Sequence, residues 1–265
     1  MASKNESCSL PAFIIAGAPA EPEFERRYGV KYRCEVPIAG RAMLLRVLDA
    51  LSASPRVKGI YIIGHAESIE GACILKPRGS FIDNLLVAVE AEPEAKRLLI
   101  VTSDIPMLTS AAVTNFIELC GDMSADFYYP IISKEVNEHR LPGIHRTYAR
   151  LAEGMFTGGN MVIINPQMVL QNAGIIGEIL LARKHPMKIA RLIGLGTLFR
   201  AALAQKVWPG ALSIARLEHV AGRILKGKVK AVPVEFPEIG ADVDSPEQAE
   251  TIERLIKQKQ EGERR

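Results

Sequence analysis

The sequence predicts an α/β fold built around a mainly parallel β-sheet. Short apolar runs alternate with amphipathic helical stretches through the first half of the chain, a pattern typical of βα units. One of these runs, residues 98–104, ends abruptly in a carboxylate. The chain has 265 residues, of which 48% are hydrophobic, and this is enough apolar material for one large core.

The first half contains three expected strands, at 13–17, 59–64 and 98–104. A helix over 41–54 separates the first two, because its apolar residues recur at i, i+3, i+4 and i+7 and form one stripe. A second helix over 80–93 precedes the third strand and stops near its proline.

The second half continues with a helix that Thr109 can cap and with strands at 126–132 and 160–165. Between these strands, residues 134–159 are polar and punctuated by Gly and Pro. We therefore expect an excursion that covers a site, rather than a packed element. Residues 167–227 have a mostly helical pattern.

A last strand at 228–236 leads to a final helix with a clear start. Ser245 can cap this helix, Pro246 suits its first position, and Gln248 is placed to close a capping box. The end of the helix, 258–265, is expected to fray into solvent.

We expect residues 1–265 to form one domain with a helical insertion at about 167–227, because no internal repeat and no long linker is visible. The longest charge-free run, 154–177, contains Gly, Asn, Gln and Pro residues that would be costly in a bilayer core. No stable membrane insertion is expected.

Composition excludes several classes of function. The formal net charge of +3 is too small to predict binding to nucleic acid. The four cysteines are scattered without a C-x-x-C pair, so neither a disulfide framework nor a zinc site is indicated, and a reducing cytoplasm fits best. The five histidines share no spacing typical of a hydrolase triad, and there is no G-x-S-x-G motif.

Candidate ligand-binding residues follow the predicted strands, because α/β sheets bind ligands beyond the carboxyl ends of their strands. Asp104 ends the third strand, and Asp244 lies just before the final helix, with Asp242 nearby. Carboxylates are hard oxygen ligands that suit Mg²⁺. The structural alternative is that Asp104 caps a turn and that Asp242 and Asp244 favour the positive end of the helix.

Basic residues follow the first strand and supply the complementary charge. Lys31, Arg33 and Arg41 are candidates for contacts with phosphates. Arg26 and Arg27 belong to the same segment but are interleaved with glutamates, so their role is less certain.

Five segments, taken in order, resemble the nucleoside-triphosphate transferases of the molybdenum-cofactor nucleotidylyltransferase type. Their superfamily also includes sugar-phosphate nucleotidylyltransferases and CMP-sugar synthetases. The segments span most of the chain and are FIIAGAP, VPIAGRAMLLRVLDAL, RGSFIDNL, LLIVTSDIPML and GADVDSPEQAE. The T-S-D-I-P and D-V-D-S-P-E patterns together are fairly specific.

The resemblance implies a three-layer α/β/α sandwich of the nucleotide-diphospho-sugar transferase type, with a mainly parallel mixed sheet. It places Mg²⁺ ligands at Asp104 and Asp244 and the phosphate-binding cation at Arg33, with Lys31 or Arg26 assisting. The nucleotide-binding positions that it implies are Gly17, Gly79, Ser80 and Asp104.

The loop after the first strand departs from the family pattern. It is AGAPAEPEFERR, with Ala18 and Pro19 where the family has glycines, and Pro19 has no backbone N–H to offer a phosphate. Arg26 or Arg27 is a candidate replacement for the arginine that usually closes this loop.

The resemblance also suggests an acceptor side. A Gly-Gly-Asn sequence lies by the acceptor in related sugar nucleotidylyltransferases, and here it points to Gly159 and Asn160. The structural alternative is a tight turn that enters a strand. Arg146 is a further candidate for acceptor contact, although an arginine beside a tyrosine is as often a packed surface pair.

The expected activity is Mg²⁺-dependent transfer of a nucleotidyl group from a nucleoside triphosphate to a phosphorylated small molecule, with release of pyrophosphate. Two alternatives stay open: a glycosyltransferase of the same fold, which typically needs a D-x-D that T-S-D lacks, and a non-catalytic nucleotide-binding regulator. The helical stretch 167–227 is expected to cap the acceptor pocket or to form the surface of a homodimer.

Overall fold

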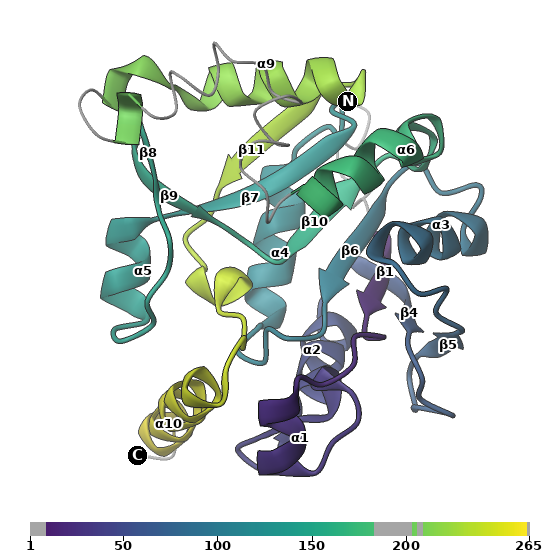
Figure 1. The fold of residues 1–265 in the computed structure, drawn as a ribbon, viewed down its shortest axis with the longest axis vertical. Helices are drawn as coiled ribbons and strands as arrows, with labels where there is room; N and C mark the ends of the chain where they lie inside the picture. Colours follow the sequence, from purple (N-terminus) through teal and green to yellow (C-terminus); the bar gives the residue numbers. More distant parts are fainter. Residues whose placement is uncertain (1–8, 183–202, 206–208, 264–265) are drawn as a thin grey trace, which may run out of the picture.

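A mixed sheet lies between two layers of helices in the computed structural model, which describes residues 9–182, 203–205 and 209–263 (Figure 1). The strand order is β5-β4-β1-β6-β10-β7-β9-β8, and β11 pairs with β7. The strands are β1 (Leu10–Ile15), β4 (Val57–Ile63), β5 (Cys73–Leu75), β6 (Leu98–Thr102), β7 (Phe127–Ser133), β8 (Ala149–Leu151), β9 (Gly154–Gly158), β10 (Met161–Ile164) and β11 (Val229–Pro233). A separate short ribbon joins β2 (Pro37–Ile38) and β3 (Arg41–Ala42).

The sheet is parallel in its first part and mixed in its second. β5, β4, β1 and β6 run parallel to one another, whereas β10 is antiparallel to both β6 and β7. The carboxyl ends of β4, β1 and β6 therefore meet at one edge, which is where the sequence places its candidate ligand-binding residues.

Helices cover both faces of this sheet and confirm the three-layer fold. The helices are α1 (Pro22–Tyr28), α2 (Met43–Ser52), α3 (Phe81–Ala91), α4 (Ser110–Leu119), α5 (Lys134–Arg140), α6 (Pro166–Ala182), α9 (Ile214–Leu225) and α10 (Pro246–Glu263). Apolar residues of α2 and α4 pack on one face, and those of α3 and α6 pack on the other. Thr109 caps α4 and Ser80 caps α3, as their sequences indicate.

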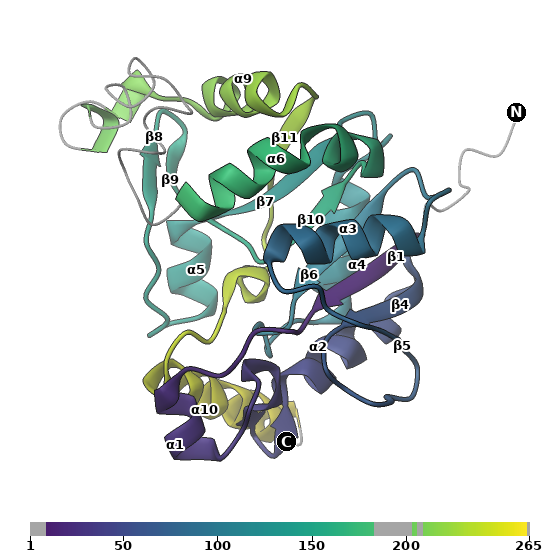
Figure 2. The same cartoon turned by 45° about the vertical axis from the view of Figure 1, so that its right-hand side comes forward.

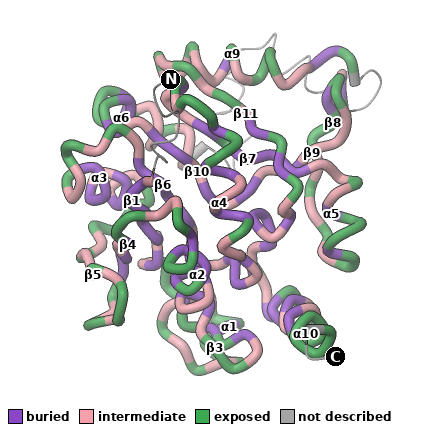
Figure 3. Tube along the Cα trace, turned by 180° about the vertical axis from the view of Figure 1, so that it is seen from behind, coloured by how far each residue is buried: buried purple, intermediate pink, exposed green. Residues whose placement is uncertain are grey.

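A third apolar cluster lies at the edge toward which β1 and β6 point. There α1 and α10 lie side by side (Figures 1 and 2). Phe24 of α1 and Ile252 of α10 are each 1% exposed, and Val243, just before α10, is fully buried with them. The buried residues of α10 follow one side of the helix (Figure 3). This cluster fixes the loop that carries Asp242 and Asp244.

Several strand boundaries differ from the sequence prediction, including those of β1 and β6. β1 begins at Leu10 rather than Phe13, although Pro11 lies inside it, because the register shifts between Leu10 and Ala12 and a bulge tolerates the missing N–H. β6 ends at Thr102, so Asp104 lies in the turn that follows the strand.

The prediction of an unpacked excursion at 134–159 was wrong. This segment contains the helix α5 and the antiparallel pair β8 and β9, which extends the sheet from β7. The buried Asn137 amide donates to the carbonyl of Ile144 at 3.2 Å and ties α5 to the following loop. The segment has a polar composition because an edge hairpin and a short helix keep one face in water.

The stretch predicted as a helical insertion packs mainly on the face of the sheet that α3 covers, where Leu225 of α9 joins the apolar cluster of α3 and α6. α6 packs against α3, and α9 packs against β11. Residues 183–202 and 206–208 of this stretch lie outside the described residues, so the insertion boundaries stay a prediction. None of the described helices is long and apolar enough to cross a membrane. The final helix extends to Glu263 and thus includes residues 258–263 of the tail that the sequence predicts to fray. Residues 264–265 lie outside the described residues.

Candidate active site

Arg33 lies at the centre of the site and contacts three carboxylates. Its backbone N–H donates to the carbonyl of Ala18 at 3.2 Å, which fixes the residue beside the loop after β1. Nε donates to Oε2 of Glu21 at 3.1 Å, and Nη2 donates to the other oxygen of the same carboxylate. Nη1 lies 2.9 Å from Oδ1 of Asp244 and 3.6 Å from Oδ2 of Asp104. Arg33 is thus a cation shared among three acidic residues.

Asp104 is held in place through its side chain and its backbone. The Thr102 hydroxyl donates to Oδ1 at 2.6 Å, and the Asp104 carbonyl accepts from the N–H of Val243 at 2.9 Å. Burial raises the pKa of Asp104, and the nearby Asp242 carboxylate adds to this rise, while Thr102 and Arg33 partly offset it. The carboxylate therefore lies where more positive charge would be favourable.

Asp244 is fixed by the start of α10. Its N–H donates to Oε1 of Gln248 at 2.6 Å, while Oγ of Ser245 accepts from the N–H of Gln248 at 3.3 Å. Ser245 therefore caps α10 as predicted, but the Gln248 side chain accepts from Asp244 rather than from Ser245 and so holds Asp244. Partial burial raises the pKa of Asp244, as does the Asp242 carboxylate, although water screens both effects because the side chain is 60% exposed.

Asp242 pairs with Arg146 rather than with Arg33. The two side chains form an ion pair and are 15% and 17% exposed. Nη2 of Arg146 also donates to the carbonyl of Gly158 at 3.2 Å, whereas its Nε is buried without a partner among the described residues. Arg146 therefore connects the loop before α10 to the end of β9.

The altered loop after β1 folds back onto the segment that carries Arg33. Pro19 forms an antiparallel bridge with Tyr32, and the N–H of Ala20 donates to the carbonyl of Lys31 at 2.9 Å. Pro19 has no N–H, and that of Ala20 is occupied, so this loop offers few backbone donors to an anion. Positive charge here comes instead from the Arg33 side chain.

The positions expected to contact the nucleotide lie near one another across this loop. A Cβ on Gly17 would lie 3.1 Å from Cβ of Pro77, which precedes the Gly79-Ser80 pair by two residues. Gly79 has a φ of +102°, and Oγ of Ser80 accepts from the N–H of Asp83 at 3.2 Å to cap α3. Gly79 is therefore required by the turn.

The Gly-Gly-Asn segment is attached to the same edge by its backbone. The N–H of Asn160 donates to the carbonyl of Ile239 at 2.8 Å, and its carbonyl accepts from the N–H of Thr102 at 3.0 Å. A Cβ on Gly159 would lie 2.6 Å from Cγ2 of Ile239. Close packing is thus sufficient to explain this glycine, which differs from the tight-turn alternative because Gly159 has no positive φ.

Two of the predicted cations lie outside this network. Lys31 and Arg26 are exposed, and neither forms an ion pair within the described part of the chain. Arg27 pairs with Glu250 of α10 instead. Sequence reasoning missed Glu21 as the partner of Arg33, because it grouped Glu21 with the arginines that follow it.

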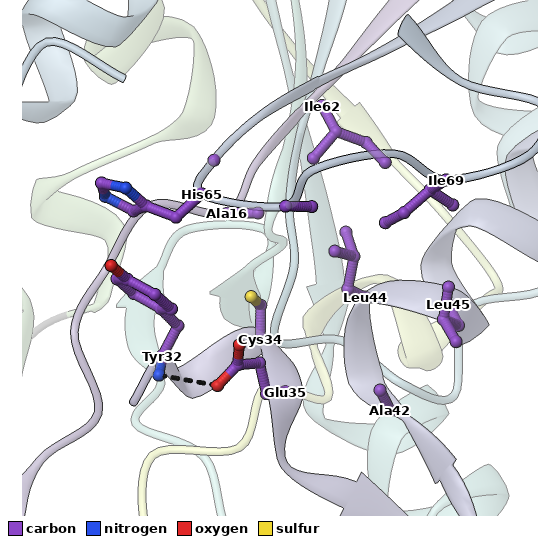
Figure 4. A pocket seen from close by; sticks show the side chains of 12 residues that line it. Ala16, Tyr32, Cys34, Glu35, Ala42, Leu44, Leu45, Ile62, His65 and Ile69 are labelled. Carbon is purple, nitrogen blue, oxygen red and sulfur yellow. Dashed lines mark hydrogen bonds between the residues drawn. The ribbon is translucent and has the colours of Figure 1, made fainter. Parts of the chain in front are cut away.

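A small apolar pocket of about 250 Å³ lies beside the site, between α2 and the ends of β1 and β4 (Figure 4). The rings of Tyr32 and His65 stack at one side, with centroids 4.4 Å apart. Burial raises the pKa of the Cys34 thiol in its wall to about 12, which excludes a thiolate nucleophile at neutral pH. Ligand pockets usually measure about 300–1,000 Å³, so this pocket is slightly smaller than most.

A parallel sheet edge that gathers two aspartates and an arginine beside the loop after β1 is typical of an α/β enzyme that acts on phosphorylated ligands. The chain belongs to the MobA-like NTP transferase domain family, whose family model matches residues 14–205. It is accordingly an enzyme of the nucleotidyltransferase class.

Solved structures share this fold. The chain is 34% identical to a hypothetical transferase from Thermus thermophilus, with a TM-score of 0.80 and coverage of 91% of this chain and 99% of that one. CMP:2-keto-3-deoxy-manno-octonic acid synthetase complexed with CTP shares the fold at 15% identity, with a TM-score of 0.57 and coverage of 95% and 99%. 2-C-methyl-D-erythritol 4-phosphate cytidylyltransferase from Thermus thermophilus shares it at 14% identity, with a TM-score of 0.51 and coverage of 94% and 99%. No protein with a curated function matches the chain.

Proposed function

We propose that the chain transfers a nucleotidyl group from a nucleoside triphosphate to a phosphorylated small molecule, with Mg²⁺ as cofactor and pyrophosphate as the second product. The observation that carries this proposal is the convergence of Asp104 and Asp244 on one cation, Arg33, at the carboxyl edge of the parallel strands. Two carboxylates from separate elements meet there beside a residue suited to bind phosphate.

The donor set suits Mg²⁺ and phosphate together. Among the described residues no group of three or more His, Cys, Asp or Glu is arranged as a metal cage. Mg²⁺ is commonly held by one or two carboxylates, with phosphate oxygens and water completing its octahedron. Asp104 and Asp244 fit that role, since burial and the neighbouring Asp242 carboxylate raise the pKa of both and leave them in need of positive charge. Bound there, Mg²⁺ would neutralise charge on the α-phosphate.

In the proposed reaction, a phosphate oxygen of the acceptor attacks the α-phosphorus of the nucleotide. A P–O bond forms there, the bond from the α-phosphorus to the bridging oxygen breaks, and its electron pair leaves with pyrophosphate. A phosphate monoester has a second pKa of about 6 and is largely ionised at neutral pH, so no general base is needed. Arg33 offsets the charge of the triphosphate and holds it in line.

The two substrates occupy different sides of the site in this proposal. The nucleotide lies over Gly17 and the Gly79-Ser80 turn, and the exposed Lys31 and Arg26 assist Arg33 at its phosphates. The acceptor lies near Gly159 and Asn160, which the backbone of Thr102 ties to the Asp104 turn. Arg146 completes the acceptor contacts.

Thermal unfolding with ATP, CTP, GTP and UTP, each with and without Mg²⁺, tests this function. A ligand at about 100 times its dissociation constant stabilises the folded state by roughly 2.7 kcal/mol. We expect one nucleotide to give a Mg²⁺-dependent shift that Asp104→Ala abolishes. Asp49→Ala, which removes an exposed carboxylate paired with Arg41, is the matched control and keeps the shift. Pyrophosphate release is then measured with pterin phosphates, sugar phosphates and phosphorylated acids.

A shift without turnover on any of these acceptors would favour the regulatory alternative, and no shift with any nucleotide would contradict the proposal.

Two further expectations accompany the proposed function. A reducing cytoplasm is proposed from the sequence, whose four cysteines are scattered without a C-x-x-C pair. A homodimer is checked by sedimentation of the purified chain.

A further inference from the structure

The cation between the two proposed Mg²⁺ ligands is the side chain of Arg33. We propose that Arg33 is the resident counter-ion of Asp104 and Asp244 and is exchanged for Mg²⁺ when a nucleoside triphosphate binds, so that metal and nucleotide bind cooperatively. This inference rests on the proposed function, since it presumes that both aspartates hold the metal.

Competition between Arg33 and the metal is direct, because both require the same oxygens. The Thr102 hydroxyl occupies Oδ1 of Asp104 at 2.6 Å, which leaves Oδ2 as the free oxygen of that carboxylate. Oδ2 is the atom that faces Nη1 of Arg33 at 3.6 Å. The same Nη1 lies 2.9 Å from Oδ1 of Asp244. Mg²⁺ binds oxygens at about 2.0–2.1 Å in a strict octahedron. Nη1 of Arg33 and a Mg²⁺ ion therefore cannot both lie between Oδ2 of Asp104 and Oδ1 of Asp244.

The guanidinium has two sides with different partners, and this permits an exchange without loss of the residue's anchor. Nε and Nη2 face Glu21, whereas Nη1 faces the aspartates. When a metal takes the aspartate oxygens, Nη1 loses its partners while Glu21 still holds the other two nitrogens. Glu21 lies on the loop after β1, where the triphosphate is expected, so Nη1 is released next to a phosphate acceptor.

The arrangement makes each ligand dependent on the other. A metal that binds without nucleotide leaves Nη1 of Arg33 without a partner, although the Arg33 side chain is only 19% exposed to water. A triphosphate that arrives alone must compete with the two aspartates for Nη1 and meets their negative charge. When metal and triphosphate bind together, the aspartates bind the metal and Nη1 of Arg33 donates to the phosphate. Thermodynamic linkage requires the two ligands to strengthen each other by the same factor.

Mn²⁺ binding to the full chain without nucleotide, followed by electron paramagnetic resonance, isolates the contribution of Arg33. We expect Arg33→Gln to bind Mn²⁺ about tenfold more tightly than the natural chain, within the range typical of coupled sites. Arg56→Gln is the matched control, because it removes an arginine from the ion pair with Glu118 at the opposite edge of the sheet and should leave Mn²⁺ affinity unchanged. The double variant Arg33→Gln with Asp104→Asn should lose the gain.

Two different failures can be distinguished in this experiment. If Arg33→Gln binds Mn²⁺ no more tightly than the natural chain while Asp104→Asn weakens the binding, the exchange is refuted and the metal site stands. If Asp104→Asn has no effect in either background, the metal site of the proposed function is refuted as well. Circular dichroism verifies folding of each variant. Should Arg33→Gln not fold, Arg33→Met replaces it, because methionine also removes the cation; an unchanged affinity in that variant would likewise refute the exchange.

Discussion

Loss of the Arg146 side chain should destabilise the fold, because it leaves the largely buried Asp242 carboxylate without its cation. The two side chains are 17% and 15% exposed, and Asp242 also stands near Asp104 and Asp244, whose pKa values it raises. Removing one partner of a buried ion pair costs about 3–5 kcal/mol. We expect Arg146→Gln to cost about 3 kcal/mol, near the low end of that range, since both residues keep some contact with water.

Urea unfolding followed by circular dichroism measures this loss, and thermal unfolding should show a decrease in Tm of roughly 6–12 °C, at about 2–4 °C per kcal/mol for a large domain. The double variant Arg146→Gln with Asp242→Asn removes the stranded charge and should recover most of the stability. Arg41→Gln is the matched control, because its pair with Asp49 is 46% and 54% exposed and should cost less than about 1 kcal/mol. An Arg146 variant as stable as the Arg41 variant, or a double variant without recovery, would refute the reasoning.

Two further predictions concern the same edge of the sheet. Gly159→Ala places a Cβ 2.6 Å from Cγ2 of Ile239 and should lower the free energy of unfolding by about 1–3 kcal/mol. Gly174→Ala in α6 meets nothing within 4 Å and should raise it by about 0.5–1 kcal/mol, so equal effects in urea unfolding would contradict the packing argument. Burial raises the pKa of Asp104 above its ordinary value of 3.8, so the folded state favours the neutral carboxyl. The stability that this gives is fully present below pH 3.8 and is lost as the pH rises through the raised pKa. Asp104→Asn should therefore increase Tm more at pH 8 than at pH 3.5; an equal increase at both would show that burial of the charge is not the cause.

Features encoded by short sequence segments were predictable from the sequence. The cap at Thr109, the strand over 98–102 and the aspartate that follows it depend on residues within one or two turns of each other. The family pattern then indicated that Asp244 belongs with Asp104, and the structure brings both to Arg33.

Contacts between distant segments were not predictable in the same way. No local pattern shows that Glu21 rather than another acid holds Arg33, or that Arg146 reaches Asp242 across 96 residues of chain. The prediction that residues 134–159 form no packed element was wrong for a related reason. Its composition reflects the water on one face of α5 and of the edge strands, while their pairing with β7 is set by the sheet.

Because Arg33 and Asp244 are separated by 211 residues, the site joins segments from near the two ends of the chain. A ribosome delivers Glu21 and Arg33 long before it delivers the loop and α10 that complete their surroundings. In the early segment Arg33 can already pair with Glu21 but has no contact with Asp244, while the parallel strands that follow can already assemble. Completion of the site coincides with docking of the last helix on α1, so a nascent chain that has folded its sheet still lacks one of the two aspartates. The site can therefore bind a nucleotide only late in synthesis. Nucleotide binding can stabilise only chains that have been synthesised through α10.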